Sequence, residues 1–336
     1  MKHPKVAVLG AGSWGTALAK LLADKGFETR LWSRREDQAR AIQEKRVNED
    51  YLPGAVLPPT LTATHDLERA LAGADLVVVV VPTVGLREVL DQAVPLFPKG
   101  APIVSATKGI EEGTLKLVSE IFEEHLPPEE HGRLTYLGGP SFAKEVADRV
   151  PTVVCVAGRD EATVKRVQDW FWTDRFRVYR TDDVIGVELG GALKNVIAIA
   201  AGVADGMGLG HNSRAGLITR GLAEITRLAV ARGGHPLTLS GLSGMGDLVL
   251  TCTGHLSRNR QVGVKLGQGM KLSEILGSMN MVAEGVKTSK SAYELGLRED
   301  VDMPITREVY LLLYHDKPAE EVVETLMMRP LRAERG

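Results

Sequence analysis

The sequence predicts an N-terminal α/β domain with a doubly wound sheet, followed by an all-helical domain. Two observations carry this prediction. Over roughly the first 180 residues, short apolar runs that are typical of buried strands alternate with helical patterns. From residue 182 onward no convincing strand pattern occurs, and the apolar spacing becomes helical. We therefore divide the chain into 1–181 and 182–336, and we expect a functional site in the cleft between the two domains.

The first predicted strand leads into a glycine-rich turn. Val6 lies in that strand, and Gly10, Gly12 and Gly15 follow in the spacing GxGxxG before a helical pattern that reaches Gly26. Gly10 permits the turn, Gly12 lets a phosphate approach the backbone, and Gly15 lets the helix pack against the strand. The helix N-terminus offers unpaired N–H groups to an anion. The spacing alone is weak evidence, but its place between a strand and a helix predicts a Rossmann-like domain that binds a dinucleotide.

The second predicted strand bears on the choice of cofactor. It spans 28–32, and its end is where such a domain contacts the adenosine ribose. Ser33, Arg34 and Arg35 follow it, and the first carboxylate after them is Glu36. An arginine there accommodates a 2′-phosphate, so the sequence favours NADP(H), with NAD(H) possible. Alternatively, both arginines are solvated, or one stacks on adenine without selecting a cofactor.

The other elements of the first domain follow from the same patterns. Segment 48–60 is expected to be a loop, 66–72 a short helix and 161–170 a longer one, with further strands at 75–82, 102–106, 134–138, 152–157 and 176–179. Lys108 follows one strand, where it either faces a ligand or is a solvated loop residue. Gly139 and Ser141 follow another, and Ser141 either caps the next helix or contacts a ligand.

The second domain is predicted to form around one buried helix. Segment 187–203 is apolar on nearly all faces, and a second long helix is expected at 212–232. Shorter helices are expected at about 256–267, 271–278, 284–298, 304–314 and 318–327.

Three features of this domain are unusual for a plain helical core. Lys194 interrupts an apolar helix, so it either snorkels to the surface or faces the cleft with a lowered pKa that suits proton exchange. Asp247 follows a glycine-rich turn, where it can cap a helix or orient Lys194. Ser257, Arg258 and Asn259 open a helix and predict a phosphate site, with capping and surface charge as the alternative.

Composition argues against several other classes of protein. The formal net charge is −2, which gives no indication of a nucleic-acid partner or a membrane-surface patch. The two cysteines, Cys155 and Cys252, are far apart and lack metal-ligand spacing, so we expect a reducing compartment, no disulfide scaffold and no metal. The N-terminus lacks the apolar stretch of a secretory signal, and the apolar run 76–82 is too short to span a bilayer. A cytoplasmic location without membrane insertion is expected.

Seven segments in register resemble the NAD(P)-dependent glycerol-3-phosphate dehydrogenases of the bacterial, biosynthetic type, over essentially the full length. They are GAGSWGTALA (10–19), SATKGIE (105–111), GGPSFAKE (138–145), GGALKNVIAIAAG (190–202), SGMGDLVLTCT (243–253), SRNR (257–260) and VAEGVKT (282–288). The resemblance implies a homodimer that reduces dihydroxyacetone phosphate to sn-glycerol 3-phosphate for glycerophospholipid synthesis.

The resemblance also implies roles for single residues. Lys194 would be the proton acceptor, with Lys108, Asp247 and Asn195 as its catalytic partners. With the loop residues Gly10, Gly12 and Gly15, the residues expected to touch the cofactor are Ser13, Trp14, Arg34, Arg35, Tyr51, Lys108, Ala143, Arg258, Val282 and Glu284. Those expected to surround the substrate are Lys108, Gly139, Ser141, Lys194, Asp247, Ser257, Arg258 and Asn259.

Two alternatives stay open from the sequence. The first is a β-hydroxyacid or 6-phosphogluconate dehydrogenase, which also places a lysine on the long helix after a glycine pair. Two features argue against it: Asn195 follows Lys194 directly, and the SRNR site suits a compact phosphate. The second is a non-catalytic NADP(H)-binding regulator, which would not need Lys108, Lys194 and Asp247 together.

Overall fold

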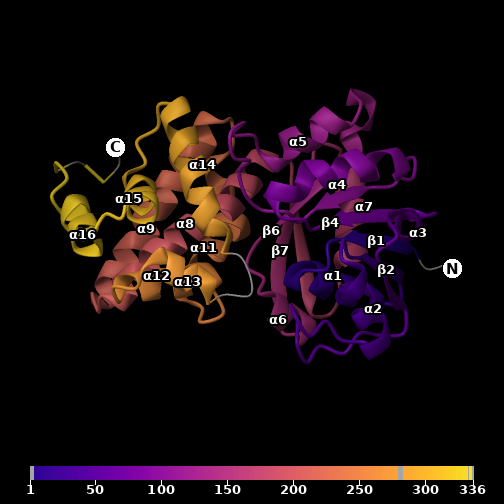
Figure 1. The fold of residues 1–336 in the computed structure, drawn as a ribbon. Coiled ribbons are helices and arrows are strands. Elements are labelled where there is room, and N and C mark those ends of the chain that lie inside the picture. Colours follow the sequence, from indigo (N-terminus) through magenta and orange to yellow (C-terminus); the bar gives the residue numbers. More distant parts are fainter. Residues whose placement is uncertain (1–3, 279–282, 332, 335–336) are drawn as a thin grey trace.

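The computed structural model describes residues 4–278, 283–331 and 333–334, and within them one sheet is flanked by helices and joined to a helical domain (Figure 1). The strands are β1 (Lys5–Leu9), β2 (Glu28–Trp32), β3 (Leu61–Thr64), β4 (Leu76–Val79), β5 (Ile103–Ser105), β6 (Leu134–Gly138), β7 (Thr152–Ala157) and β8 (Phe176–Thr181). Their order in the sheet is β3-β2-β1-β4-β5-β6-β7-β8. The predicted fold class is thereby confirmed.

The helices on the sheet are α1 (Ser13–Asp24), α2 (Glu36–Lys45), α3 (Leu67–Leu71), α4 (Leu86–Ala93), α5 (Val118–His125), α6 (Ala143–Ala147) and α7 (Glu161–Phe171), with short 3₁₀ turns at Thr83–Gly85, Val94–Leu96 and Pro128–Arg133. Neighbouring strands pair in parallel except β6 and β7, which are antiparallel. β3 is not predicted from the sequence, because only Leu61 of its four residues is fully buried and the apolar signal is short.

Both faces of the sheet are covered, which explains the unbroken apolar runs of the central strands. In β1, Val6 and Val8 belong to the core on one face, whereas Ala7 and Leu9 belong to the core on the other. Side chains alternate along a strand, so a strand buried on both faces needs apolar residues at every position.

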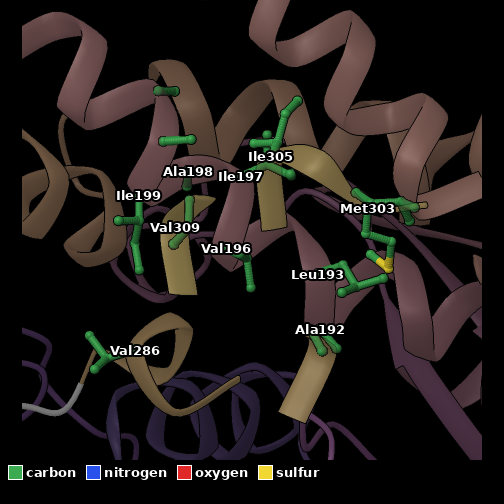
Figure 2. Packing of buried hydrophobic residues seen from close by; sticks show 14 of the residues in the cluster. Ala192, Leu193, Val196, Ile197, Ala198, Ile199, Val286, Met303, Ile305 and Val309 are labelled. Carbon is green, nitrogen blue, oxygen red and sulfur yellow. The ribbon is translucent and has the colours of Figure 1, made fainter. Parts of the chain in front are cut away.

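The helical domain surrounds α8 (Val184–Gly206). Its other helices are α9 (Gly210–Ala231), α10 (Pro236–Leu239), a π-helical turn (Leu242–Gly246), α11 (Asp247–Thr253), α12 (Arg258–Gly267), α13 (Leu272–Gly277), α14 (Glu284–Arg298), α15 (Pro304–Tyr314) and α16 (Ala319–Met327). Figure 2 shows apolar residues of α8 beside those of α14 and α15. By length and composition α8 could cross a membrane, but 89% of its most apolar window is buried inside the structure, as in the core helix of a globular domain.

Two boundaries near α8 differ from the sequence prediction. The helix begins at Val184 rather than 187, because the Asp183 carboxylate caps it by accepting a hydrogen bond from the Gly186 N–H. The segment 236–253 holds α10, the π-helical turn and α11, where the sequence indicated a glycine-rich turn and kept a helix after Asp247 as one alternative. A methyl group at Gly244 would overlap the backbone of Leu239, so the π-helical turn packs directly against the end of α10. The domain division at 181/182 stays a prediction.

Candidate active site

The glycine turn after β1 has the geometry of a phosphate cradle. Gly10 has φ +117°, and a Cβ there would overlap the carbonyl oxygen of Val80. A Cβ at Gly15 would overlap the carbonyl oxygen of Gly10, so α1 packs directly against the turn. A Cβ at Gly12, by contrast, would meet nothing within 4 Å. The open side of Gly12 at the N-terminus of α1 is where an anion can approach the backbone, which fits a dinucleotide.

Across from the carboxyl edge of the sheet, one carboxylate holds two lysines. The Lys108 Nζ donates to Asp247 Oδ2 at 3.0 Å, and the Lys194 Nζ donates to Asp247 Oδ1. Asp247 is fully buried, and the side chains of Lys108 and Lys194 are 17% and 10% exposed. The three residues come from the segment after β5, the middle of α8 and the start of α11. Lys194 therefore does not snorkel, and Asp247 pairs with the lysines instead of capping a helix.

The glycine pair before Lys194 makes room for this cluster. A Cβ at Gly191 would lie 3.6 Å from the Lys108 Cδ, so the stem of that lysine runs over the bare backbone of α8. A Cβ at Gly190 would overlap the carbonyl oxygen of Ser243 in the π-helical turn. Lys108 comes from the sheet domain, and the π-helical turn that precedes Asp247 comes from the helical domain. Both reach the neighbourhood of Lys194 because the two glycines leave the backbone of α8 bare.

The pKa values of the two lysines shift in opposite directions. Burial lowers the pKa of Lys194 to about 8, and the positive charge of Lys108 adds to that effect while Asp247 opposes it. Burial also acts to lower the pKa of Lys108, but the attraction and hydrogen bond of Asp247 outweigh it and raise that pKa. These directions favour Lys194 over Lys108 as the group that exchanges a proton near neutral pH.

The N-termini of α12 and α14 meet beside this cluster. Ser257 caps α12, since its Oγ accepts a hydrogen bond from the Arg260 N–H at 3.3 Å. The Asn259 Oδ1 accepts one from the Gly285 N–H at 3.0 Å. A Cβ at Gly285 would lie 2.7 Å from the carbonyl oxygen of Asn195, the residue after Lys194. The predicted phosphate site thus lies next to the turn of α8 that carries Lys194.

Glu284 lies within the electrostatic field of the same group. Burial raises the pKa of its carboxyl, and the positive charges of Arg258, Lys108 and Lys194 act in the opposite direction. Asn195 is buried, but no hydrogen bond between described residues joins its side chain to Lys194, so its positioning role stays a prediction.

The predicted cofactor residues lie around the glycine turn. The Ser13 Oγ donates to the Tyr51 carbonyl oxygen at 2.6 Å, which ties α1 to the loop 48–60. Trp14 packs against the hydrophobic core that α1 shares with one face of the sheet, and its buried Nε1 has no hydrogen-bond partner among the described residues. Arg34 and Arg35 follow β2 with side chains that are 72% and 52% exposed. Val282 lies outside the described residues.

The structure of the segment after β6 excludes one of the two interpretations of Ser141. Gly139 has φ +117°, and a Cβ there would lie 3.0 Å from the Val154 Cα, so a larger residue is excluded. The Ser141 Oγ donates to the Gly139 carbonyl oxygen at 3.0 Å. Phe142, not Ser141, is the N-cap of α6, so the capping interpretation of Ser141 is wrong. Ala143 begins that helix and packs against the hydrophobic core to which α1 also contributes.

Two further findings limit the chemistry. Within the described part of the chain, no three or more His, Cys, Asp or Glu side chains are grouped as a metal site requires. Both cysteines are free and buried, and burial raises their pKa values to about 11 for Cys155 and about 12 for Cys252. Neither thiol is suited to act as a nucleophile at neutral pH.

Comparison with known proteins identifies the family of the chain. The family model for the NAD-dependent glycerol-3-phosphate dehydrogenase N-terminus matches residues 5–164, and the model for the C-terminus of the same family matches residues 183–324. A glycerol-3-phosphate dehydrogenase [NAD(P)+] from Geobacter sp. (strain M21) is 57% identical over 330 residues, which are 98% of each chain. One from Leptospira biflexa is 55% identical and covers 98% of this chain and 99% of its own.

A solved structure extends the likeness to three dimensions. The crystal structure of glycerol-3-phosphate dehydrogenase from Coxiella burnetii superposes with a TM-score of 0.92 at 41% identity, covering 97% of this chain and 99% of that one. Sequence and fold agree, and the chain belongs to the NAD-dependent glycerol-3-phosphate dehydrogenase family.

Proposed function

We propose that this chain catalyses the reversible, NAD(P)H-dependent reduction of dihydroxyacetone phosphate to sn-glycerol 3-phosphate, with Lys194 as the acid and base. The observation that carries the proposal is the buried Lys108–Asp247–Lys194 cluster beside the N-terminus of α12. The names of the relatives support the substrate and the cofactor class.

In this proposal the residues around the glycine turn hold the dinucleotide. The backbone at Gly12 and the N-terminus of α1 bind its pyrophosphate, and Ser13, Trp14, Tyr51 and Ala143 lie around them. Arg34 and Arg35 lie at the end of β2, where the adenosine ribose is expected. When bound, the reduced nicotinamide supplies a hydride to a carbonyl carbon.

The lysines act on the oxygen of that carbonyl. Lys194 gives a proton to the oxygen as negative charge develops on it, and in the opposite direction the neutral amine takes the proton from the alcohol. Lys108 stabilises the same charge as a cation. Asp247 holds both ammonium groups in place from a buried position, so little reorganisation is needed during the reaction.

The phosphate of the substrate is assigned to the start of α12. Arg258 carries a positive charge there, Asn259 lies beside it, and the helix N-terminus points its N–H groups toward an anion. Binding of this remote group orients the reacting carbon near Lys194.

Arg258→Ala tests the phosphate assignment. Loss of a charge-assisted contact is expected to raise the KM for dihydroxyacetone phosphate by about 10- to 100-fold. The effect on kcat should be smaller, because the lysine cluster is untouched. Steady-state kinetics with the ketone varied measure it, and an unchanged KM would remove Arg258 from the phosphate site.

The activity itself is tested by absorbance at the nicotinamide band. We expect loss of the reduced-cofactor absorbance that depends on added dihydroxyacetone phosphate. The exposed Arg34 and Arg35 favour NADPH over NADH when the two are compared at matched concentrations. If the absorbance does not change on addition of the ketone with either cofactor, a non-catalytic regulator becomes the better interpretation.

The proposal includes a homodimer in the cytoplasm that supplies the backbone of glycerophospholipids. Met327 and Met328, both 78% exposed at the end of α16, are apolar surface in the helical domain that a second copy can cover. Light scattering of the purified chain tests the dimer, and a monomer at all concentrations would contradict it.

A further inference from the structure

The helix that begins with the predicted phosphate site lies in direct backbone contact with α8. Gly202 and Gly206 of α8 face α12, and a Cβ at either would overlap a carbonyl oxygen of α12, that of Arg260 or Val264. The reverse holds for Gly263 and Gly267 of α12, where a Cβ would overlap the carbonyl oxygens of Ile199 and Val203. No side chain separates the helices along this line of contact.

These contacts also give the direction of the two helices. Gly263 meets Ile199 and Gly267 meets Val203, so the residue numbers rise together and the helices run the same way. The start of α12 therefore points back toward the part of α8 that carries Lys194. Whatever fixes α12 along the axis of α8 also fixes the distance from the phosphate site to the reacting lysine.

Glycine has no side chain that could interlock with the facing helix and fix the position of α12 along α8. An ion pair, however, crosses the contact between the two helices. The Arg260 Nε donates to Asp205 Oδ2 at 2.8 Å, and the Arg260 Nη2 forms an ion pair with the same oxygen at 2.7 Å. Asp205 lies one residue before the end of α8, and Arg214 of α9 donates to its Oδ1 at 3.0 Å. The side chains of Arg260 and Asp205 are only 20% and 14% exposed, so solvent screens this pair weakly.

We propose that Arg260 is a positioning residue, which through Asp205 holds the phosphate-binding end of α12 in register with Lys194. The inference rests on the proposed function, because that function assigns the phosphate to Arg258 and Asn259. Arg260 itself points away from the site, toward the far end of α8. A shift of about 1 Å between a binding group and the reacting atoms is enough to cost up to 100-fold in rate.

Arg260→Lys tests the proposal, because lysine keeps the positive charge but has one nitrogen where arginine brings two to Asp205. We expect the KM for dihydroxyacetone phosphate to rise about tenfold, with little change in the KM for the nicotinamide cofactor. Reduction of dihydroxyacetone, which lacks the phosphate, should keep its kcat/KM, because its reaction does not use α12. Asp205→Asn should give the same pattern.

Arg214→Lys is the matched control. It weakens the other ion pair of Asp205, on α9, without touching α12. We expect a similar loss of thermal stability and an unchanged KM for dihydroxyacetone phosphate. If Arg260→Lys lowers turnover of the phosphorylated and unphosphorylated ketones equally, or leaves the KM unchanged, the positioning role is wrong.

Arg258→Ala separates this inference from the function on which it rests. If that variant raises the KM and Arg260→Lys does not, only the positioning role fails. If neither variant changes the KM, the phosphate assignment fails with it.

Discussion

Replacing Lys194 with alanine is expected to lower kcat in both directions by about 10²- to 10⁴-fold, with a modest change in cofactor affinity. The variant loses the group that gives and takes the proton. We do not expect Lys108 to replace it, because the Asp247 carboxylate favours the charged form of Lys108 and raises its pKa. Steady-state kinetics and cofactor titration of the folded variant measure the two effects.

Lys194→Arg is the control for charge. Arginine keeps a cation next to Asp247 but does not give up its proton at neutral pH. Both variants should therefore be poorly active. Near-normal turnover in the alanine variant would remove Lys194 from the reaction, and near-normal turnover in the arginine variant would show that only charge is needed.

Asp247→Asn is expected to have the second large effect, on both stability and rate. The carboxylate is fully buried, and its loss leaves two neighbouring ammonium groups without the counter-charge that pairs with both of them. Breaking a buried ion pair in this way costs about 3–5 kcal/mol of the free energy of unfolding. Denaturant titration measures that loss, and kcat should fall because neither lysine is held in place.

Lys108→Met combined with Asp247→Asn tests whether repulsion between the two ammonium groups causes the loss of stability. Removing one ammonium relieves the repulsion, so the double variant should recover part of the lost stability but no activity. If Asp247→Asn is as stable as the parent chain, the carboxylate does not balance the lysines as proposed.

The sequence predicted the elements that carry a long or repeated signal. α14 and α15 begin and end where the pattern placed them, and β6 and β7 match because each is a run of buried residues bounded by turns. β3 was missed because four residues with one buried leucine give little pattern. α10 and α11 were not predicted as helices of their own because each is short and they flank a glycine-rich segment, Leu242–Gly246, which carries the signal of a turn.

The site was harder to predict than the fold. Local patterns left Lys194, Asp247 and Ser141 each with two interpretations, because spacing along the chain does not show what lies opposite a side chain in space. The structure brings Lys108, Lys194 and Asp247 together from three segments, and it gives Ser141 a backbone partner instead of a cap. Arg260 stood in a recognised motif, but its partner Asp205 lies 55 positions away and had no signal of its own.

The pH dependence of kcat/KM, measured in both directions, tests the central claim that Lys194 moves the proton. Reduction needs the ammonium form, so its rate should fall as the pH rises through about 8. Oxidation needs the neutral amine, so its rate should rise through the same pH. Two limbs of opposite slope with a common midpoint are the predicted result, and limbs of the same slope in both directions would contradict the account.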